Sequence, residues 1–163
     1  MPGPGIGLLL VPGLAFAAAG ADTACLAIAS HPDGRPLAQV EAGREAFTVS
    51  YVHSVTRTPV EERYRVEGDA IVETEIRFRR HGPGLPTEAD AGGQWRRDGD
   101  AWVVSMARRF HTIAMRVHAD QRWRLVAEGD PRPVNLAQWG NRAVALSARP
   151  GPCLTGPTGF GAR

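Results

Sequence analysis

Apolar and polar residues alternate along most of the chain with a period of two, which is typical of half-buried β-strands rather than of helices. Three consecutive segments, 47–55, 60–67 and 72–79, show the alternation most clearly. A shorter apolar run, Cys25 to Ser30, ends at a His-Pro-Asp-Gly turn, in which proline presets φ and Asp-Gly accommodates a positive φ. The predominantly apolar side of the three strands reads Phe47, Val49, Tyr51, His53, Val55, then Val60, Glu62, Tyr64, Val66, and then Val72, Thr74, Ile76, Phe78.

The second and third of these strands are joined near Gly68 and Asp69, and the parity of the alternation constrains the turn. A two-residue loop would pair Val66 with Ile71, which sets the apolar row of one strand beside the polar row of the next. A three-residue loop would instead pair Val66 with Val72. We therefore predict a three-residue or bulged hairpin that includes Gly68 and Asp69.

The alternation stops at residues 81–93, where glycine, proline and polar residues predict a long loop that packs on itself or contributes to a site. Strands are expected again at 94–96, 102–106, 112–118, 122–126 and 143–148, with one helical turn at 135–139. About ten short strands separated by frequent turns predict an all-β fold, a small antiparallel β-sandwich or barrel.

Residues 1–21 carry no charged side chain, and their apolar run is followed by small residues in an Ala-x-Ala pattern. This pattern predicts a signal peptide or a weak N-terminal anchor, although no basic residue precedes the apolar run. The run is too short, and too interrupted by Pro12 and Gly13, for a membrane-spanning helix. We then expect one all-β domain over 22–150, a Gly- and Pro-rich tail over 151–163, and a periplasmic or otherwise exported protein that meets the membrane only through an uncleaved leader.

The charged residues give little reason to expect a nucleic-acid partner. The net charge is only +2, all 19 basic residues are arginine, and they are interspersed with acidic residues. A nucleic-acid binder would gather its basic charge on one face.

Two cysteines, Cys25 and Cys153, lie near opposite ends of the expected domain. In an oxidising compartment such a pair can form a disulfide that ties the termini together. Two separate buried thiols are the alternative. Lipidation of Cys25 is disfavoured, because the preceding Asp22-Thr23-Ala24 lacks a large apolar residue.

The segment from Tyr51 to Tyr64 places ionisable residues at core-facing positions, His53 on one strand and Glu62 on the next. Removing an ionisable group from water costs free energy, and at a buried position this cost must be offset by a partner. Since a short connection joins the two strands, we predict that His53 and Glu62 meet or flank one pocket mouth. Ser54 and Thr58 would add hydrogen-bonding groups, giving a site suited to a polar or anionic ligand.

The same pair also has a purely structural interpretation, in which it pins its own loop. A small hydrolase or metal-dependent enzyme that uses His53 and Glu62 is the functional alternative. Neighbouring His53 and Ser54 cannot act together on one strand, because their side chains point to opposite faces. No histidine pair has a recognised metal-ligand spacing, and no nucleophile elbow is present. We therefore expect no catalytic residue, no metal site and no cofactor.

At this segment the chain resembles a small bacterial domain family of unknown function that is often encoded beside, or fused to, TAXI-type tripartite (TRAP) transporters. The resemblance covers most of residues 25–148. The motifs that carry it are Phe47-Thr48-Val49-Ser50-Tyr51, His53-Ser54-Val55, Thr58-Pro59-Val60, Glu62, Tyr64, Arg77-Phe78 and Gly82-x-Gly84-Leu85-Pro86.

The resemblance implies an exported accessory module of a TAXI-type TRAP uptake system. We expect this module to bind a small organic ligand or a transporter component and not to be catalytic. The ligand would be a small organic molecule such as a carboxylate, and the partner would be a TAXI-type binding protein or a TRAP permease. We expect the ligand or partner surface to form from the 53–62 region and the 81–86 loop, with the residues His53, Ser54, Thr58, Glu62, Tyr64, Gly82, Gly84 and Leu85.

Overall fold

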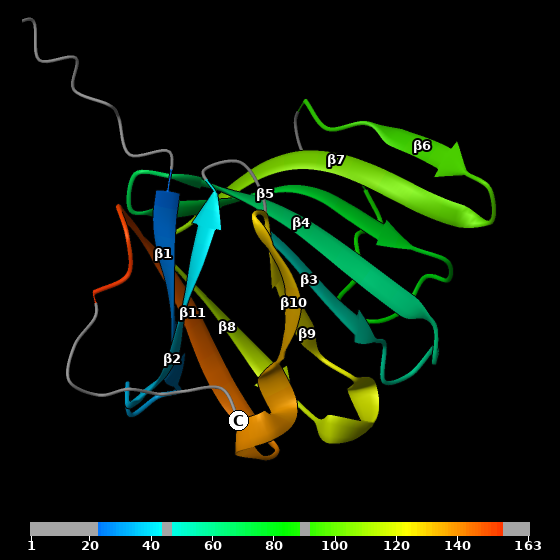
Figure 1. Ribbon diagram of the computed structural model, residues 1–163. Helices are drawn as coiled ribbons and strands as arrows, with labels where there is room; N and C mark the ends of the chain where they lie inside the picture. The colour runs from blue at the N-terminus through cyan, green and yellow to red at the C-terminus, as the bar shows by residue number, and fades with distance from the viewer. Residues whose placement is uncertain (1–22, 44–46, 89–91, 155–163) are drawn as a thin grey trace, which may run out of the picture.

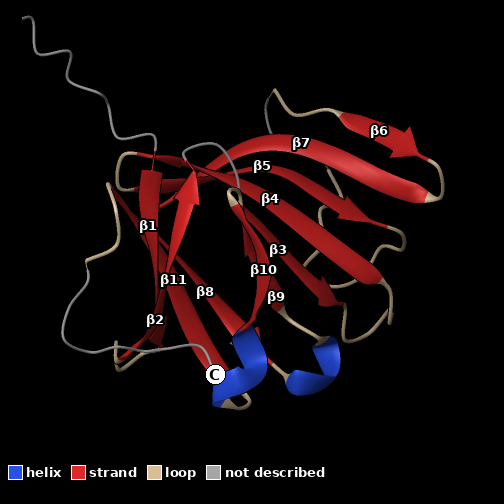
Figure 2. Cartoon of the chain, in the orientation of Figure 1, coloured by secondary structure: helices blue, strands red, loops and turns tan. Residues whose placement is uncertain are grey.

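In the computed structural model, residues 23–43, 47–88 and 92–154 are described, and their strands form two antiparallel sheets (Figures 1 and 2). The four-stranded sheet has the order β2-β1-β11-β8, and the seven-stranded sheet has the order β10-β9-β3-β4-β5-β7-β6. The prediction of an all-β, antiparallel fold is confirmed. The strands are β1 (Thr23–Ser30), β2 (Pro36–Gly43), β3 (Phe47–Val52), β4 (Pro59–Glu67), β5 (Ala70–Phe78), β6 (Trp95–Asp98), β7 (Ala101–Phe110), β8 (Thr112–Val117), β9 (Arg124–Ala127), β10 (Asp130–Asn135) and β11 (Arg142–Pro150).

Two short 3-10 helices, η1 (Ala119–Gln121) and η2 (Leu136–Trp139), are the helical elements of the described residues (Figure 2). The predicted helical turn is η2, which begins where the side chain of Asn135 accepts a hydrogen bond from the Ala137 N–H at 3.0 Å. No helix in the described part of the chain has the length and hydropathy needed to cross a bilayer. The predicted leader lies outside the described residues, as does the tail after Leu154.

The main core lies between the two sheets and follows from the alternation seen in the sequence. Its largest fully buried side chains include Leu26 and Ile28 from β1, Leu146 from β11 and Val49 from β3. Each such side chain contributes roughly 1.5–3 kcal/mol by leaving water. The two faces that build the core are therefore the apolar faces that the period of two predicted.

The β4–β5 turn is shorter than we predicted from the sequence. Only Gly68 and Asp69 lie between the paired ends of the strands, and Val66 lies opposite Ile71 rather than Val72. The three-residue loop was therefore wrong, and the bulged hairpin, the other form that we predicted, is the one found. Gly68 adopts a φ of 65°, which suits a tight two-residue turn whose twist matches that of the strands.

The mismatch of apolar and polar rows is corrected inside the strands by a β-bulge at Thr74 of β5. The Thr74 hydroxyl donates a hydrogen bond to the carbonyl of Arg63 at 3.1 Å. Beyond the bulge, Val60 lies opposite Phe78, so apolar residues again face apolar residues. One extra residue in one strand has the same effect on parity as one extra residue in the turn.

Two strands, β2 and β10, are absent from the sequence prediction. In β10, Pro131 and Pro133 interrupt any strand pattern, because proline cannot donate to a ladder. The structure tolerates them because β10 is an edge strand of the seven-stranded sheet. The remaining expected strands are found, with ends that differ by a few residues.

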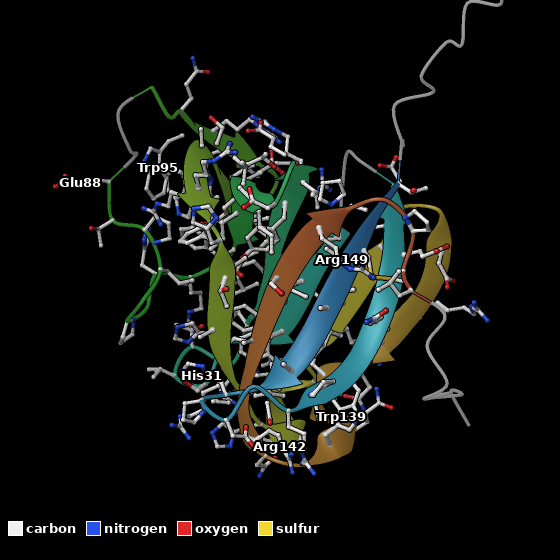
Figure 3. The ribbon with its side chains drawn as sticks, turned by 90° about the vertical axis from the view of Figure 1, so that its left-hand side faces the viewer. His31, Glu88, Trp95, Trp139, Arg142 and Arg149 are labelled. Atoms are coloured by element: carbon white, nitrogen blue, oxygen red, sulfur yellow. A yellow bond between two sulfur atoms is a disulfide. The ribbon has the colours of Figure 1, made fainter. Side chains whose placement is uncertain are left out.

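The seven-stranded sheet extends past the four-stranded sheet, so that β6 and the adjoining part of β7 project from the body of the domain (Figure 1). Figure 3 shows Glu88 and Trp95 on this projecting part. A second core cluster covers one face of it, where Leu85 packs against Val60, Phe78 and Val104. The 81–86 loop is thereby fastened to the sheet.

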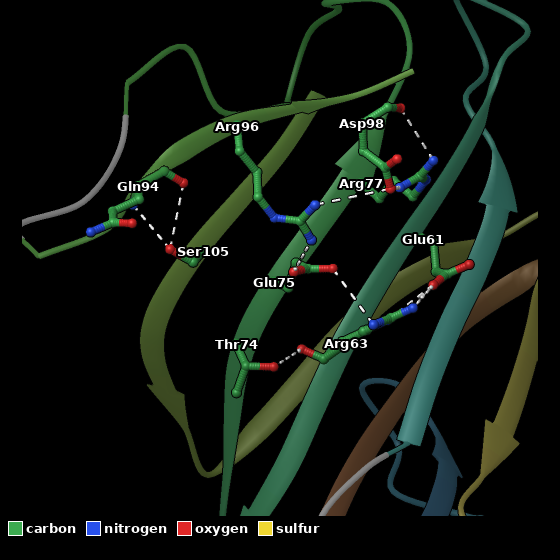
Figure 4. A network of polar contacts seen from close by, with 9 residues as sticks. All are labelled: Glu61, Arg63, Thr74, Glu75, Arg77, Gln94, Arg96, Asp98 and Ser105. Atoms are coloured by element: carbon green, nitrogen blue, oxygen red, sulfur yellow. Dashed lines mark hydrogen bonds and ion pairs between the residues drawn. The ribbon is translucent and has the colours of Figure 1, made fainter. Parts of the chain in front are cut away.

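The other face of the projecting part carries a network of ion pairs and hydrogen bonds (Figure 4). Glu75 accepts from Arg96 at 3.0 Å and lies 3.7 Å from Arg63, and Arg77 pairs with Asp98. Solvent-exposed pairs of this kind contribute little to stability. The network therefore marks this face as solvated.

The predicted disulfide between Cys25 and Cys153 is formed, with a Cα–Cα distance of 4.8 Å. It connects β1 to the segment that follows β11, 128 residues later. Structural disulfides persist in oxidising compartments, so the bond points to an oxidising environment of the kind found outside the cytoplasm.

Candidate functional site

Four of the predicted site residues, His53, Ser54, Gly84 and Leu85, line one open depression of about 410 Å³. We call it the His53 depression. It lies where the β3–β4 connection, the 81–86 loop, the end of β8 and η1 come together. Its other lining residues are Tyr51, Pro83, Arg116, His118, Gln121 and Trp123.

His53 holds two walls of the depression together. Its Nδ1 accepts hydrogen bonds from the N–H groups of Val55 at 3.1 Å and Thr56 at 3.2 Å, which closes the turn after β3. Its Nε2 lies 3.0 Å from the carbonyl oxygen of Pro83 in the 81–86 loop. Because Nδ1 accepts, Nε2 carries the hydrogen and donates to Pro83. The imidazole is thus a clamp between two loops.

Gly82 allows the 81–86 loop to approach this ring. A Cβ atom at Gly82 would lie 2.8 Å from Cε1 of His53 and 2.8 Å from Cγ2 of Thr56. Such distances are too short for real contacts, and moving the imidazole away would disturb its three hydrogen bonds. Gly84 adopts a φ of 83°, which favours glycine at the tip of the same loop.

The predicted pairing of His53 with Glu62 is wrong. Neither an ion pair nor a hydrogen bond joins the two side chains, both of which the structure describes. The strand register gives the reason, because Glu62 lies opposite Val49. His53 lies four positions after Val49, which is about 13 Å along an extended strand.

Glu62 is instead held by two tyrosines. Tyr51 donates to its Oε1 at 2.9 Å and Tyr64 donates to its Oε2 at 2.6 Å. Burial raises the pKa of the Glu62 carboxyl, and the hydrogen bonds from Tyr64 and Tyr51 oppose that rise. The pKa values of both phenols are raised, first by burial and then by the nearby charge of Glu62.

The remaining predicted residues do not line the depression. Thr58 is part of the turn, where its hydroxyl lies 2.9 Å from that of Thr56 and its carbonyl accepts from the His53 N–H. Tyr64 belongs to the main core, where its ring stacks on Phe47 with 5.0 Å between centroids. Gly82 lies against the imidazole of His53 and does not line the depression. These residues support the site from outside it.

Arg116, His118 and Trp123 are lining residues that the sequence analysis missed. Trp123 stacks on Tyr51 with 4.1 Å between ring centroids, and its indole N–H donates to Gln121 at 2.7 Å. Arg116 forms no ion pair or hydrogen bond with any residue that the structure describes. No local signal identified these side chains, since their positions depend on how β8 and η1 pack beside β3.

A family model described as "Domain of unknown function (DUF1850)" matches residues 47–133. The chain belongs to this family. No curated protein and no solved structure matches the chain. The family match confirms the resemblance to a domain of unknown function and leaves the connection with TAXI-type transporters as a prediction.

The matched span of the DUF1850 domain runs from β3 almost to the end of β10. It therefore includes every residue that lines the His53 depression. The strands β1, β2 and β11, and both cysteines, lie outside it. Among the described residues, no three His, Cys, Asp or Glu side chains come together in a way that could hold a metal ion.

The raised pKa of Glu62 predicts a pH dependence of stability in this DUF1850 domain. A carboxyl whose folded-state pKa lies above its unfolded value binds its proton more tightly when folded, so its contribution is fully present below the unfolded pKa and is lost as the pH rises through the folded pKa. Wild-type stability is therefore expected to fall relative to Glu62→Gln with rising pH. Urea unfolding of both proteins from acidic to neutral pH measures this.

Glu128→Gln is the control for that comparison, because it removes one exposed carboxylate elsewhere on the domain. The difference between Glu128→Gln and wild type reports the general effect of losing a negative charge. A wild-type protein that gained stability relative to Glu62→Gln as the pH rose would contradict the assignment of burial as the dominant cause.

Proposed function

We propose that the protein is an exported, non-catalytic module of a TAXI-type TRAP solute uptake system, and that the His53 depression binds a small organic carboxylate. The observation that carries this proposal is Arg116, a cation at a loop-walled depression with no partner among the described residues. A guanidinium group matches a carboxylate with two parallel hydrogen bonds.

The other walls of the depression suit such a ligand. The stacked rings of Tyr51 and Trp123 offer an apolar side for a carbon skeleton, and His118 offers a further polar group. The volume of about 410 Å³ lies within the range of small-molecule sites. Both ring nitrogens of His53 already bond to protein groups, which favours a role in shaping the site over a role in catalysis.

Two further observations support export and the transport connection. The Cys25–Cys153 disulfide fits an oxidising compartment such as the periplasm. The sequence resemblance is the ground for proposing a connection with a transporter, and the expected partner is a TAXI-type binding protein or the permease. In this proposal the domain receives or presents the carboxylate during uptake.

Calorimetric titration of the purified, oxidised protein with succinate tests the binding site. We expect binding by the wild type and a decrease in affinity of about tenfold or more in Arg116→Ala, because a charge-assisted pair is lost. Arg116→Lys keeps the charge without the planar fork and should restore only part of the affinity. Arg35→Ala, in the exposed β1–β2 turn, is the matched control and should bind like the wild type.

Equal affinities of wild type and Arg116→Ala would reject the site, and so would a wild type that binds no mono-, di- or tricarboxylate. The transport assignment is tested separately by measuring uptake of labelled carboxylates in a strain that lacks the gene. Uptake that stays normal in this strain would reject the transporter role, whatever the titration shows.

A further inference from the structure

A second and larger groove, of about 1000 Å³, separates the edge strands of the two sheets. One wall is β2 of the four-stranded sheet and the other is β10 with the turn that precedes it. We call it the β2–β10 groove. At one end the Gly43 N–H donates to the Glu128 carbonyl at 3.1 Å, and this is the one backbone hydrogen bond between β2 and that turn among the described residues.

The direction of this hydrogen bond shows which backbone groups of β2 face the groove. In a β-strand the N–H and C=O of residues i and i+2 point to the same side. The backbone N–H of Gly43 points away from β1. The backbone N–H and C=O groups of Glu41 and Gln39 therefore also point away from β1, into the groove. The pairing of β2 with β1 is regular over this stretch. The groove is therefore lined by backbone donors and acceptors that have no strand partner.

The two walls are not equivalent. On the β10 side, Pro131 and Pro133 have no N–H groups, which protects that edge against pairing. The stretch of β2 from Ala38 to Gly43 contains no proline, and it has no neighbouring strand on its groove side, the side away from β1. Of the two strands that line the groove, β2 is thus the one whose backbone N–H and C=O groups can pair with an added strand.

The charges along the groove indicate the chemistry of that strand. Glu128 forms no ion pair with any residue the structure describes, and Glu41 accepts one hydrogen bond from the Cys153 N–H at 3.2 Å. The one lining cation, Arg132, is paired with Asp130 at 2.8 Å. The groove therefore carries uncompensated negative charge. A second copy of β2 would place like charges together, whereas a basic strand would be complementary.

We propose that β2 binds an extended, basic polypeptide segment of a partner protein, which adds to the edge of the four-stranded sheet and occupies the β2–β10 groove. The segment would alternate basic and apolar residues, with apolar side chains toward partly buried Val40 and Val134. This proposal does not rest on the carboxylate site, because the groove and the His53 depression share no lining residue.

The test uses the full oxidised protein and a fluorescent peptide of seven residues that alternate Arg and Val. We expect saturable binding that weakens with salt, and no binding of the same peptide with Glu in place of Arg. Gln39→Pro should lower the affinity about tenfold, since it removes an N–H that faces the groove and leaves a peptide carbonyl unpaired. Gln39→Ala loses the same side chain, keeps the N–H, and should bind within about twofold of wild type.

A second pair of variants tests the charge. Glu128→Lys should weaken binding about fivefold, whereas Glu88→Lys, which makes the same change of net charge on the projecting loop (Figure 3), should have no effect. Unfolding midpoints of all variants establish that each protein remains folded. Equal affinities of Gln39→Pro and Gln39→Ala, or equal binding of the acidic peptide, would overturn the proposal. Self-association that Gln39→Pro abolishes, without peptide binding, would assign the edge to a second copy instead.

Discussion

Replacement of both cysteines by alanine is expected to lower the free energy of unfolding by roughly 3–5 kcal/mol, the largest effect of any variant considered for this protein. The Cys25–Cys153 bond closes a loop of 128 residues, so it restricts the unfolded chain over almost its whole folded length. The same bond holds the segment after β11, where Gly151 donates to the Thr23 carbonyl at 2.9 Å. Urea unfolding at neutral pH measures the loss.

The slope of that transition provides a second readout. An unfolded chain without the cross-link is more expanded and exposes more surface, so the dependence on urea should be steeper in the double variant. Wild-type protein treated with a reductant is the control, because it keeps both sulfur atoms while losing the bond. A loss below about 1 kcal/mol in both proteins would mean that native contacts, rather than the cross-link, hold the ends of the domain together.

Replacement of His53 by alanine is expected to cost roughly 2–4 kcal/mol, although the residue lies at the edge of the domain. Three hydrogen bonds are lost, and each typically contributes about 1 kcal/mol net. Two of them close the turn after β3 and the third fastens the 81–86 loop through Pro83. The N–H groups of Val55 and Thr56 lose their acceptor in this variant.

His53→Asn separates the two functions of the ring. The amide oxygen of asparagine can accept from the N–H two residues later, as in an Asx turn, but the shorter side chain cannot reach Pro83. We expect it to recover about half of the lost stability. His118→Ala is the matched control from the same depression, and it should change stability by less than about 0.5 kcal/mol. A His53→Ala protein as stable as this control would refute the clamp.

The local pattern was sufficient for most of the strands and for the faces that they bury, although it missed β2 and β10. Val49 and Phe78 are core residues because their positions alternate with polar ones, and a period of two depends only on near neighbours. The pattern also indicated that one extra residue is needed between β4 and β5 for their apolar residues to lie opposite each other. The pattern could not show where the extra residue that restores apolar-to-apolar pairing lies. A bulge at Thr74 and a third turn residue satisfy the same alternation.

At the candidate site, two segments named from the sequence share one depression, but the contact predicted between His53 and Glu62 is absent. His53, Ser54, Gly84 and Leu85 do lie together, because a short connection and a glycine-containing loop converge there. The proposed contact between His53 and Glu62 failed because register is a long-range property. An offset of four residues along a strand is invisible to the alternation, which reads the same at every even shift.

The sequence by itself therefore determined the all-β class, most of the strands, the apolar faces and the cysteine pair that could form a disulfide. The tertiary structure alone decided which residues share a site. It placed Arg116 and Trp123 beside His53, assigned Glu62 to two tyrosines, and set β2 opposite β10. The physical reason is that periodicity arises from neighbouring residues, whereas sites arise from strand order, register and bulges, which are set by contacts between residues far apart in the chain.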